Sequence, residues 1–164
     1  MKGTDRLFIV IVVGAVLLVG AGMAVMLLRP DATYQSQDTP EGVAHNYLLA
    51  LEKGDYQRAY GYLSDTLPGY PPDLEAFETS IDRNPWAFRT EDDSSVTVES
   101  VEGSGTKAVV TVRETRFYHY GLFESSQRIS TFEITLRQRQ DQWKIVDAEG
   151  YFAWCWSDNE GCDY

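Results

Sequence analysis

Two carboxylates near the C-terminus, Asp147 and Glu149, are the best candidates in this sequence for acid–base chemistry. They continue the alternation of Trp143 and Ile145, so a strand without a bulge would turn all four side chains to one face. A carboxylate becomes an effective general base when burial moves its pKa towards neutrality. We therefore expect Asp147 and Glu149 to face the interior of the domain.

Aromatic side chains are expected to approach this pair: Tyr47 from a helix, and Tyr118, His119 or Tyr120 from a long strand. Each member of the candidate pocket also has a structural interpretation. The carboxylates can pair with arginines on neighbouring strands, and tyrosines are often core residues with a solvated hydroxyl. His119 stands in an aromatic run (FYHY), which favours a packed or rim position over a base.

No other pattern in the chain indicates chemistry. The sequence lacks a nucleophile motif, a glycine-rich phosphate loop and a metal-ligand spacing. We therefore expect a protein that is not an enzyme and that has no catalytic residues, no cofactor and no metal.

The two cysteines, Cys155 and Cys162, are separated by turn-forming residues. In an oxidising compartment such a pair can close a small loop, so a disulfide is the favoured interpretation. Free thiols come second. A metal site comes third, because no histidine lies nearby in the sequence to complete it.

Large aromatic residues gather just before this pair, in the segment 151–156 (YFAWCW). Trp154 and Trp156 are expected either to cap the open end of the fold or to form an exposed contact. Tryptophan is enriched in both protein interfaces and membrane interfaces, and capping is slightly favoured. Upstream, Trp86 and Phe88 are predicted to be core residues.

The most distinctive element of the sequence is the uncharged apolar run from Leu7 to Leu28, which precedes all of the candidate residues above. As a helix it is about 33 Å long, enough to span a hydrocarbon core of about 30 Å. A cleaved signal peptide would have a shorter apolar core, so an uncleaved transmembrane anchor is favoured. Lys2 and Arg6 precede the run and place the N-terminus inside.

Residues 1–6 are then a short inner tail and residues 29–38 a polar linker. Gly20 and Ala24 form a small-xxx-small pair, a weak indication of a partner helix in the membrane. The formal net charge is −11, with the acidic excess after Arg29, which argues against nucleic acid as a partner.

The remaining chain, 39–164, predicts one α+β domain. Thr39 should cap a helix that begins at Pro40, Asp55 a second helix and Asp73 a third. From residue 95 the apolar period changes to two, which predicts antiparallel strands up to about residue 147. Gln140-Asp141-Gln142 is expected to be the turn of the last hairpin.

This order of elements resembles the nuclear transport factor 2-like superfamily, whose members have a cone-shaped α+β fold. The resemblance rests on the opening helix 40–51, the phrase EKGDYQRAY at 52–60 and the final strand QWKIVD at 142–147. It implies about three helices packed on a curved antiparallel sheet. The superfamily includes catalysts, binding proteins and scaffolds, so the resemblance implies a fold and not a function.

Together these features predict a single-pass protein of the cell membrane with its C-terminal domain periplasmic or extracellular. The expected role is a non-catalytic accessory or assembly subunit of a larger membrane complex. One alternative is a tethered small-ligand-binding or isomerase/cyclase-like domain that uses the cone pocket. A second alternative is a cell-envelope scaffold.

Overall fold

A computed structural model describes residues 2–27, 32–89, 94–119, 125–158 and 160–162 of the chain. The chain divides into two compact units, Met1–Thr33 and Tyr34–Tyr164. The first unit contains helix α1 (Lys2–Leu27), for which the side chains of residues 8–23 are described. Among the side chains described, no helix is both long enough and apolar enough to cross a membrane.

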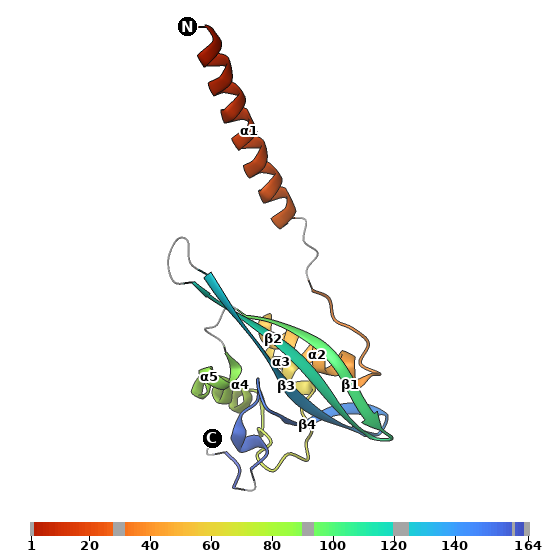
Figure 1. The fold of residues 1–164 in the computed structure, drawn as a ribbon. Helices are drawn as coiled ribbons and strands as arrows, with labels where there is room; N and C mark the ends of the chain where they lie inside the picture. The colour runs from red at the N-terminus through yellow and green to blue at the C-terminus, as the bar shows by residue number, and fades with distance from the viewer. Residues whose placement is uncertain (1, 28–31, 90–93, 120–124, 159, 163–164) are drawn as a thin grey trace. The chain divides into compact units, whose positions relative to one another are not determined.

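The second unit, hereafter the C-terminal domain, begins with helices (Figure 1). Their starts follow local capping: the Thr39 hydroxyl accepts from Gly42 N, and Asp55 and Asp73 accept from backbone N–H groups of the next two helices. The predicted caps are therefore confirmed. The helices are α2 (Pro40–Glu52), α3 (Tyr56–Gly61), α4 (Leu74–Arg83) and α5 (Pro85–Phe88).

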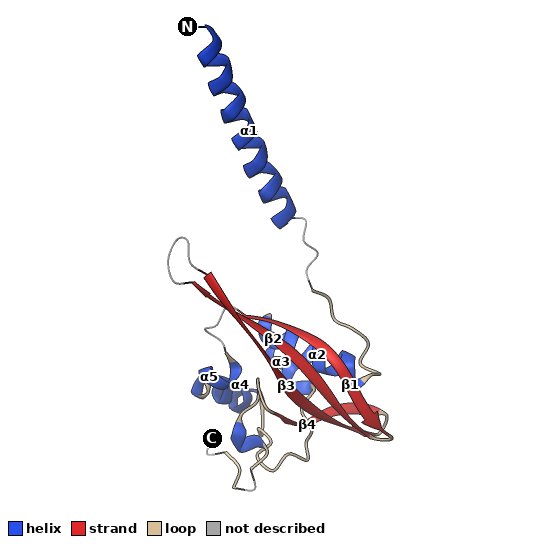
Figure 2. Cartoon of the chain, in the orientation of Figure 1, coloured by secondary structure: helices blue, strands red, loops and turns tan. Residues whose placement is uncertain are grey.

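In the described part of the domain, four antiparallel strands follow in the order β1-β2-β3-β4. They are β1 (Ser94–Ser104), β2 (Lys107–His119), β3 (Ser125–Arg139) and β4 (Gln142–Ala148), and a 3₁₀ turn, η1 (Trp154–Trp156), closes the domain. Figure 2 shows the strands as one strongly twisted sheet, and α2 contacts β1, β2 and β4. The predicted α+β class with an antiparallel sheet is confirmed.

The core lies between α2 and the inner face of this sheet. Alternate residues of β2 and β3, such as Val110, Val112 and Ile134, are fully buried there. At the far end Trp156 is also fully buried and stacks on Phe77, with 5.4 Å between ring centroids. The turn between β3 and β4 has positive φ at both Gln140 and Asp141, as the hairpin prediction requires.

Two local expectations differ from the structure. The sequence predicts Trp86 as a core residue, but its side chain is 72% exposed, whereas Phe88 is buried as predicted. The helix-breaking pair Asn84-Pro85 ends α4 but also starts the one-turn helix α5, because proline is favoured at a first helical position. That short turn buries Ala87 and Phe88 and leaves Trp86 outward.

Candidate functional site

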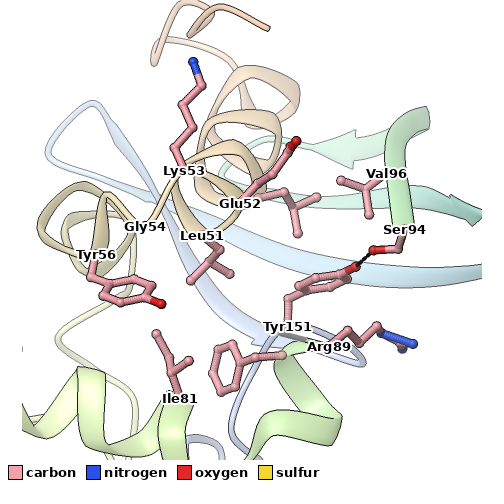
Figure 3. Close-up of a pocket in the computed structure, with 12 residues that line it drawn as sticks. Leu51, Glu52, Lys53, Gly54, Tyr56, Ile81, Arg89, Ser94, Val96 and Tyr151 are labelled. Carbon is pink, nitrogen blue, oxygen red and sulfur yellow. Dashed lines mark hydrogen bonds between the residues drawn. The ribbon is translucent and has the colours of Figure 1, made fainter. Parts of the chain in front are cut away.

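A cavity of about 480 Å³ lies between the end of α2, helices α4 and α5, and the start of β1 (Figure 3). Its walls are partly apolar, with a polar edge at Arg89, Ser94 and Tyr151, and Glu52 and Lys53 also line it. The apolar residues come from four elements: Leu48, Leu51, Ile81, Phe88 and Val96. A concave apolar site with a few convergent polar groups is the usual form of a small-molecule site.

The polar edge of this cavity is built on a buried carboxylate that the sequence predictions missed. Glu114 is fully buried on β2, where it follows Val110 and Val112 at the inward-facing positions. Arg89 approaches it with Nε at 2.8 Å from Oε1 and donates from Nη1 to Oε2 at 2.9 Å. Arg116 Nε lies 3.2 Å from Oε2. The sequence pattern that could have predicted this burial is the alternation of β2, which places Glu114 on the same inward face as Val110 and Val112.

Two hydroxyl groups complete the shell around Glu114. The Tyr151 hydroxyl donates to Oε1 at 3.0 Å and the Ser130 hydroxyl to Oε2 at 3.2 Å. Ser94 Oγ lies 3.2 Å from the Tyr151 hydroxyl and reaches the cavity, as Figure 3 shows. Both carboxylate oxygens are therefore occupied by donors, and a buried charge needs such compensation.

Two residues at this edge have unusual backbone conformations. Arg89 and Tyr151 both have positive φ, 53° and 57°, a region that side chains with a Cβ rarely adopt. Tyr151 N donates to Ala87 O, which joins the C-terminal segment to α5. Burial raises the pKa of Tyr151 to about 12, so its hydroxyl remains a proton donor at neutral pH.

The expected carboxylate pair is not in this cavity. Asp147 and Glu149 are both exposed, and neither lines the cavity around Tyr151. The pairing of β3 with β4 shifts between Thr135, opposite Asp147, and Leu136, opposite Ile145. This irregularity inserts one residue and reverses the side-chain alternation, so the inward placement of both carboxylates is wrong. Glu149 instead accepts a hydrogen bond from the backbone N–H of Glu133.

Among the aromatic members of the predicted pocket, Tyr47 and Tyr118 do not line the cavity. Tyr47 is fully buried on α2 and donates its hydroxyl hydrogen bond to the carbonyl of Tyr151. Burial raises the pKa of the Tyr47 phenol. Tyr118 is half-buried on β2, and the side chain of His119 and the whole of Tyr120 lie outside the described residues. The structure thus joins Tyr47 to Tyr151 at the edge of the cavity through a structural contact.

The C-terminal predictions have mixed outcomes. Cys155 and Cys162 form a disulfide, as favoured from their spacing. Trp156 is fully buried and caps the core, while Trp154 is 61% exposed. An exposed contact therefore stays a prediction for Trp154 alone, because Trp156 is buried.

The proposed helix contact in the first unit stays a prediction. A Cβ added at Gly20 would meet no atom within 4 Å, and the side chain of Ala24 lies outside the described residues. In the described part of the chain, no group of three His, Cys, Asp or Glu side chains is placed to hold a metal ion.

Comparison with known proteins finds similarity to solved structures alone: no protein-family model matches the sequence, and no curated protein matches it significantly. A SEC-C motif containing protein from Rhodopseudomonas palustris is 13% identical, with 71% of this chain and 81% of that chain covered and a TM-score of 0.45. A nuclear transport factor 2 (NTF2-like) superfamily protein from Salmonella enterica is 12% identical, with 67% and 87% covered and a TM-score of 0.42.

The β subunit of benzoate 1,2-dioxygenase from Burkholderia mallei is 14% identical, with 71% of this chain and 90% of that chain covered and a TM-score of 0.43. The solved structures similar to this chain thus include NTF2-like proteins, the group that the sequence resembles. The names of such structures include a putative dehydratase, a putative hydroxylase and an enzyme subunit.

Proposed function

We propose that this chain is a single-pass, membrane-anchored accessory subunit that acts by binding other proteins and not by catalysis. In this proposal residues 7–28 cross the membrane, the N-terminus lies inside, and the C-terminal domain lies in the periplasm or outside the cell. The domain then presents its surface to larger subunits of a membrane complex.

One observation supports the proposed membrane anchor. Large apolar side chains of α1 are exposed at consecutive positions, and consecutive positions cover every face of a helix. A helix that is apolar all round needs an apolar environment, and lipid supplies one along its whole length. The exposed side chains include Phe8, Ile9, Val10, Ile11, Val12, Val13, Val16, Leu17, Leu18, Val19 and Met23.

Two further features support the outer location of the domain. Disulfides persist in oxidising compartments, and Cys155 is bonded to Cys162. Lys2 and Arg6 precede the apolar run whereas Arg29 alone follows it closely, an excess that favours the N-terminus inside.

The non-catalytic part of the proposal rests on Glu114. This is the only buried carboxylate among the described side chains. Its oxygens form ion pairs with Arg89 and Arg116 and accept hydrogen bonds from Tyr151 and Ser130. A general base needs a free lone pair directed at its substrate. Glu114 is therefore better suited to holding β2, α5 and the C-terminal segment together.

The test of the subunit role is purification of the native protein in a mild detergent, followed by native mass spectrometry. We expect the 18.5 kDa chain to be recovered with other membrane proteins in a fixed stoichiometry. Recovery as a lone monomer across several mild detergents would contradict the proposal.

The cavity favours a second candidate, a tethered domain that binds a small ligand. Its apolar walls and its polar edge suit a small apolar molecule with one hydrogen-bonding end. Replacing Leu51 with Trp would fill the cavity from α2, with the exposed Gln57→Trp on α3 as the control. Loss of a co-purified small molecule from the Leu51 variant alone, measured by mass spectrometry of the extracted protein, supports this candidate.

A further inference from the structure

The polar edge of the cavity contains hydrogen bonds that run in one direction. They lead from Ser94, which lines the cavity, through the Tyr151 hydroxyl to the buried carboxylate of Glu114, and we call these three groups the hydroxyl chain. Figure 3 shows the bond between Ser94 and Tyr151 at the cavity. The order of donors and acceptors along the hydroxyl chain determines what Ser94 can offer to a bound molecule.

The direction is set at Glu114. This side chain forms ion pairs with Arg89 and Arg116, so it is a carboxylate, and a carboxylate accepts hydrogen bonds but cannot donate them. The Tyr151 hydroxyl therefore donates to Glu114 Oε1, over 3.0 Å. A phenol has a single proton, so towards any other neighbour the Tyr151 oxygen can only accept.

The next bond then determines the orientation of the Ser94 hydroxyl. Ser94 Oγ lies 3.2 Å from the Tyr151 hydroxyl oxygen, and Ser94 is the donor because the Tyr151 proton is already given to Glu114. The single proton of the Ser94 hydroxyl is thus directed at Tyr151. A molecule in the cavity meets the lone pairs of Ser94 Oγ, which accept a hydrogen bond but do not donate one.

The other polar side chains of the lining do not change this polarity. Figure 3 shows the side-chain ends of Glu52 and Lys53 pointing away from the apolar walls. Arg89 directs Nε and Nη1 to Glu114, and its guanidinium group also points away from these walls in Figure 3. Tyr56 lines the cavity with a hydroxyl that can both donate and accept, so it does not select between ligand ends. The hydroxyl chain therefore sets the polarity of this edge.

We propose that the cavity selects small apolar molecules that end in a hydroxyl group, because Ser94 offers the ligand a hydrogen-bond acceptor. This inference rests on the second candidate function, the binding of a small ligand. A hydroxyl end donates to Ser94 while the apolar part contacts side chains such as Leu51, Ile81 and Val96. A ligand that ends in a ketone or an ether would place two acceptors against each other and leave both without a donor.

A neutral hydroxyl suits this edge better than a charged end. Burying an ammonium group costs free energy unless an opposite charge pairs with it. Glu114, the carboxylate of the hydroxyl chain, already pairs with Arg89 and Arg116. A carboxylate end on the ligand is disfavoured as well, because it would face the lone pairs of Ser94.

The test uses two probes of nearly the same shape. Menthol and menthone share one carbon skeleton, but menthol ends in a hydroxyl that donates, whereas the carbonyl of menthone only accepts. Each probe is titrated into the full chain in detergent, and binding is followed by NMR of the isoleucine methyl groups. Ile81 lines the cavity, and Ile129 is exposed on β3 and serves as the reference for partitioning of the probe into detergent.

We expect menthol to bind about tenfold more tightly than menthone, because a buried acceptor that lacks a donor is costly. Leu51→Trp, which fills the cavity, should abolish the shifts of Ile81 with both probes. The exposed control Gln57→Trp should leave these shifts unchanged.

Tyr151→Phe tests the direction of the hydroxyl chain. The phenylalanine keeps the ring but removes the oxygen that accepts from Ser94, so the Ser94 proton becomes free to point into the cavity. We expect menthone to bind this variant more tightly than it binds the unmodified chain. The preference for menthol should fall to about threefold or less.

Ser94→Ala provides a second test that leaves the bond between Tyr151 and Glu114 in place. This variant removes the acceptor at the cavity and should weaken menthol binding by about threefold or more. Ser125→Ala, at an exposed position of β3, is the matched control and should bind menthol as the unmodified chain does. Far-ultraviolet circular dichroism checks that all variants remain folded.

The outcomes separate this inference from the ligand-binding candidate. If neither probe shifts Ile81, or if Leu51→Trp leaves the shifts unchanged, the candidate fails and the inference falls with it. If both probes bind with equal affinity and Leu51→Trp blocks them, the candidate stands and the inference alone is overturned. A preference for menthol that is the same in Tyr151→Phe as in the unmodified chain would also overturn it.

Discussion

The substitution Glu114→Gln separates a structural carboxylate from a catalytic one. The glutamine would keep the shape of the side chain but remove the negative charge that Arg89 and Arg116 share. The Glu114 side chain is fully buried, and the side chains of Arg89 and Arg116 are 15% and 25% exposed, so water cannot replace the lost charge effectively. Removing one partner of a buried ion pair costs about 3–5 kcal/mol.

For a domain of this size, that loss lowers the melting temperature by about 10–20 °C. Urea unfolding followed by tryptophan fluorescence, to which the buried Trp156 contributes, gives the free energy of unfolding. Glu133→Gln is the matched control, because Glu133 is exposed on β3, the strand next to β2. We expect the control to change the free energy of unfolding by less than about 0.5 kcal/mol.

A double variant sharpens the interpretation. Adding Arg116→Gln to Glu114→Gln removes one of the two cations that pair with Glu114 and should recover part of the lost stability. If the free energy of unfolding of Glu114→Gln lies within about 0.5 kcal/mol of that of the unmodified protein, the buried network does not stabilise the fold. The structural assignment of Glu114 is then refuted.

Three further predictions test other contacts of the domain. Trp156→Ala should destabilise the domain by about 3–5 kcal/mol in urea unfolding, because Trp156 is fully buried against Phe77, Phe88 and Phe152; an equal loss for the exposed Trp154→Ala would contradict this. Reduction of the Cys155–Cys162 disulfide should cost about 2–3 kcal/mol, measured with and without a thiol reductant, since the loop that it closes is short. Burial raises the pKa of Tyr151 to about 12 in the folded protein, so the folded protein keeps the phenol proton at a pH where the unfolded chain has lost it. The stabilisation that the protonated Tyr151 gives the fold is fully present below pH 10 and is lost as the pH rises towards about 12. Ultraviolet titration of Tyr151→Phe should show one high-pH phenol fewer than the unmodified protein, and identical titrations would contradict it.

Local signals in the sequence predict much of the C-terminal domain. Thr39, Asp55 and Asp73 cap helices as expected, and the change from helical to alternating periodicity marks the sheet. The disulfide is also favoured by the residues between its cysteines. These features depend on near neighbours in the chain, which is why one sequence is enough to predict them.

The predicted pocket was wrong because one irregularity in strand pairing determines which side chains of β4 face inward. One inserted residue in β4 reverses the face on which Asp147 and Glu149 lie, and the alternation of β4 itself gives no sign of it. Glu114 was overlooked because a charged residue within a strand is usually solvated. Its burial depends on Arg89, which is 25 residues away in sequence.

The segment 34–38 shows the same limit for the predicted linker. Residues 34–38 have no apolar period and contain polar side chains typical of a loop. Their fixed position depends on an amide at Asn46 and an open space at Gly42, neither of which is distinctive in a helix sequence. Docking of a polar segment through its backbone leaves little trace in its own composition.

The most direct test of the proposed function is alkaline carbonate extraction of membranes that contain the full chain. We predict that the unmodified 18.5 kDa chain stays in the membrane pellet uncleaved, as does the control Val13→Leu with Leu17→Val. Val13→Lys with Leu17→Lys should move the chain to the soluble fraction, because each central lysine costs about 2.5–3.5 kcal/mol in a membrane helix. Release of the unmodified chain by carbonate, or loss of residues 1–28 from its measured mass, would contradict the anchor.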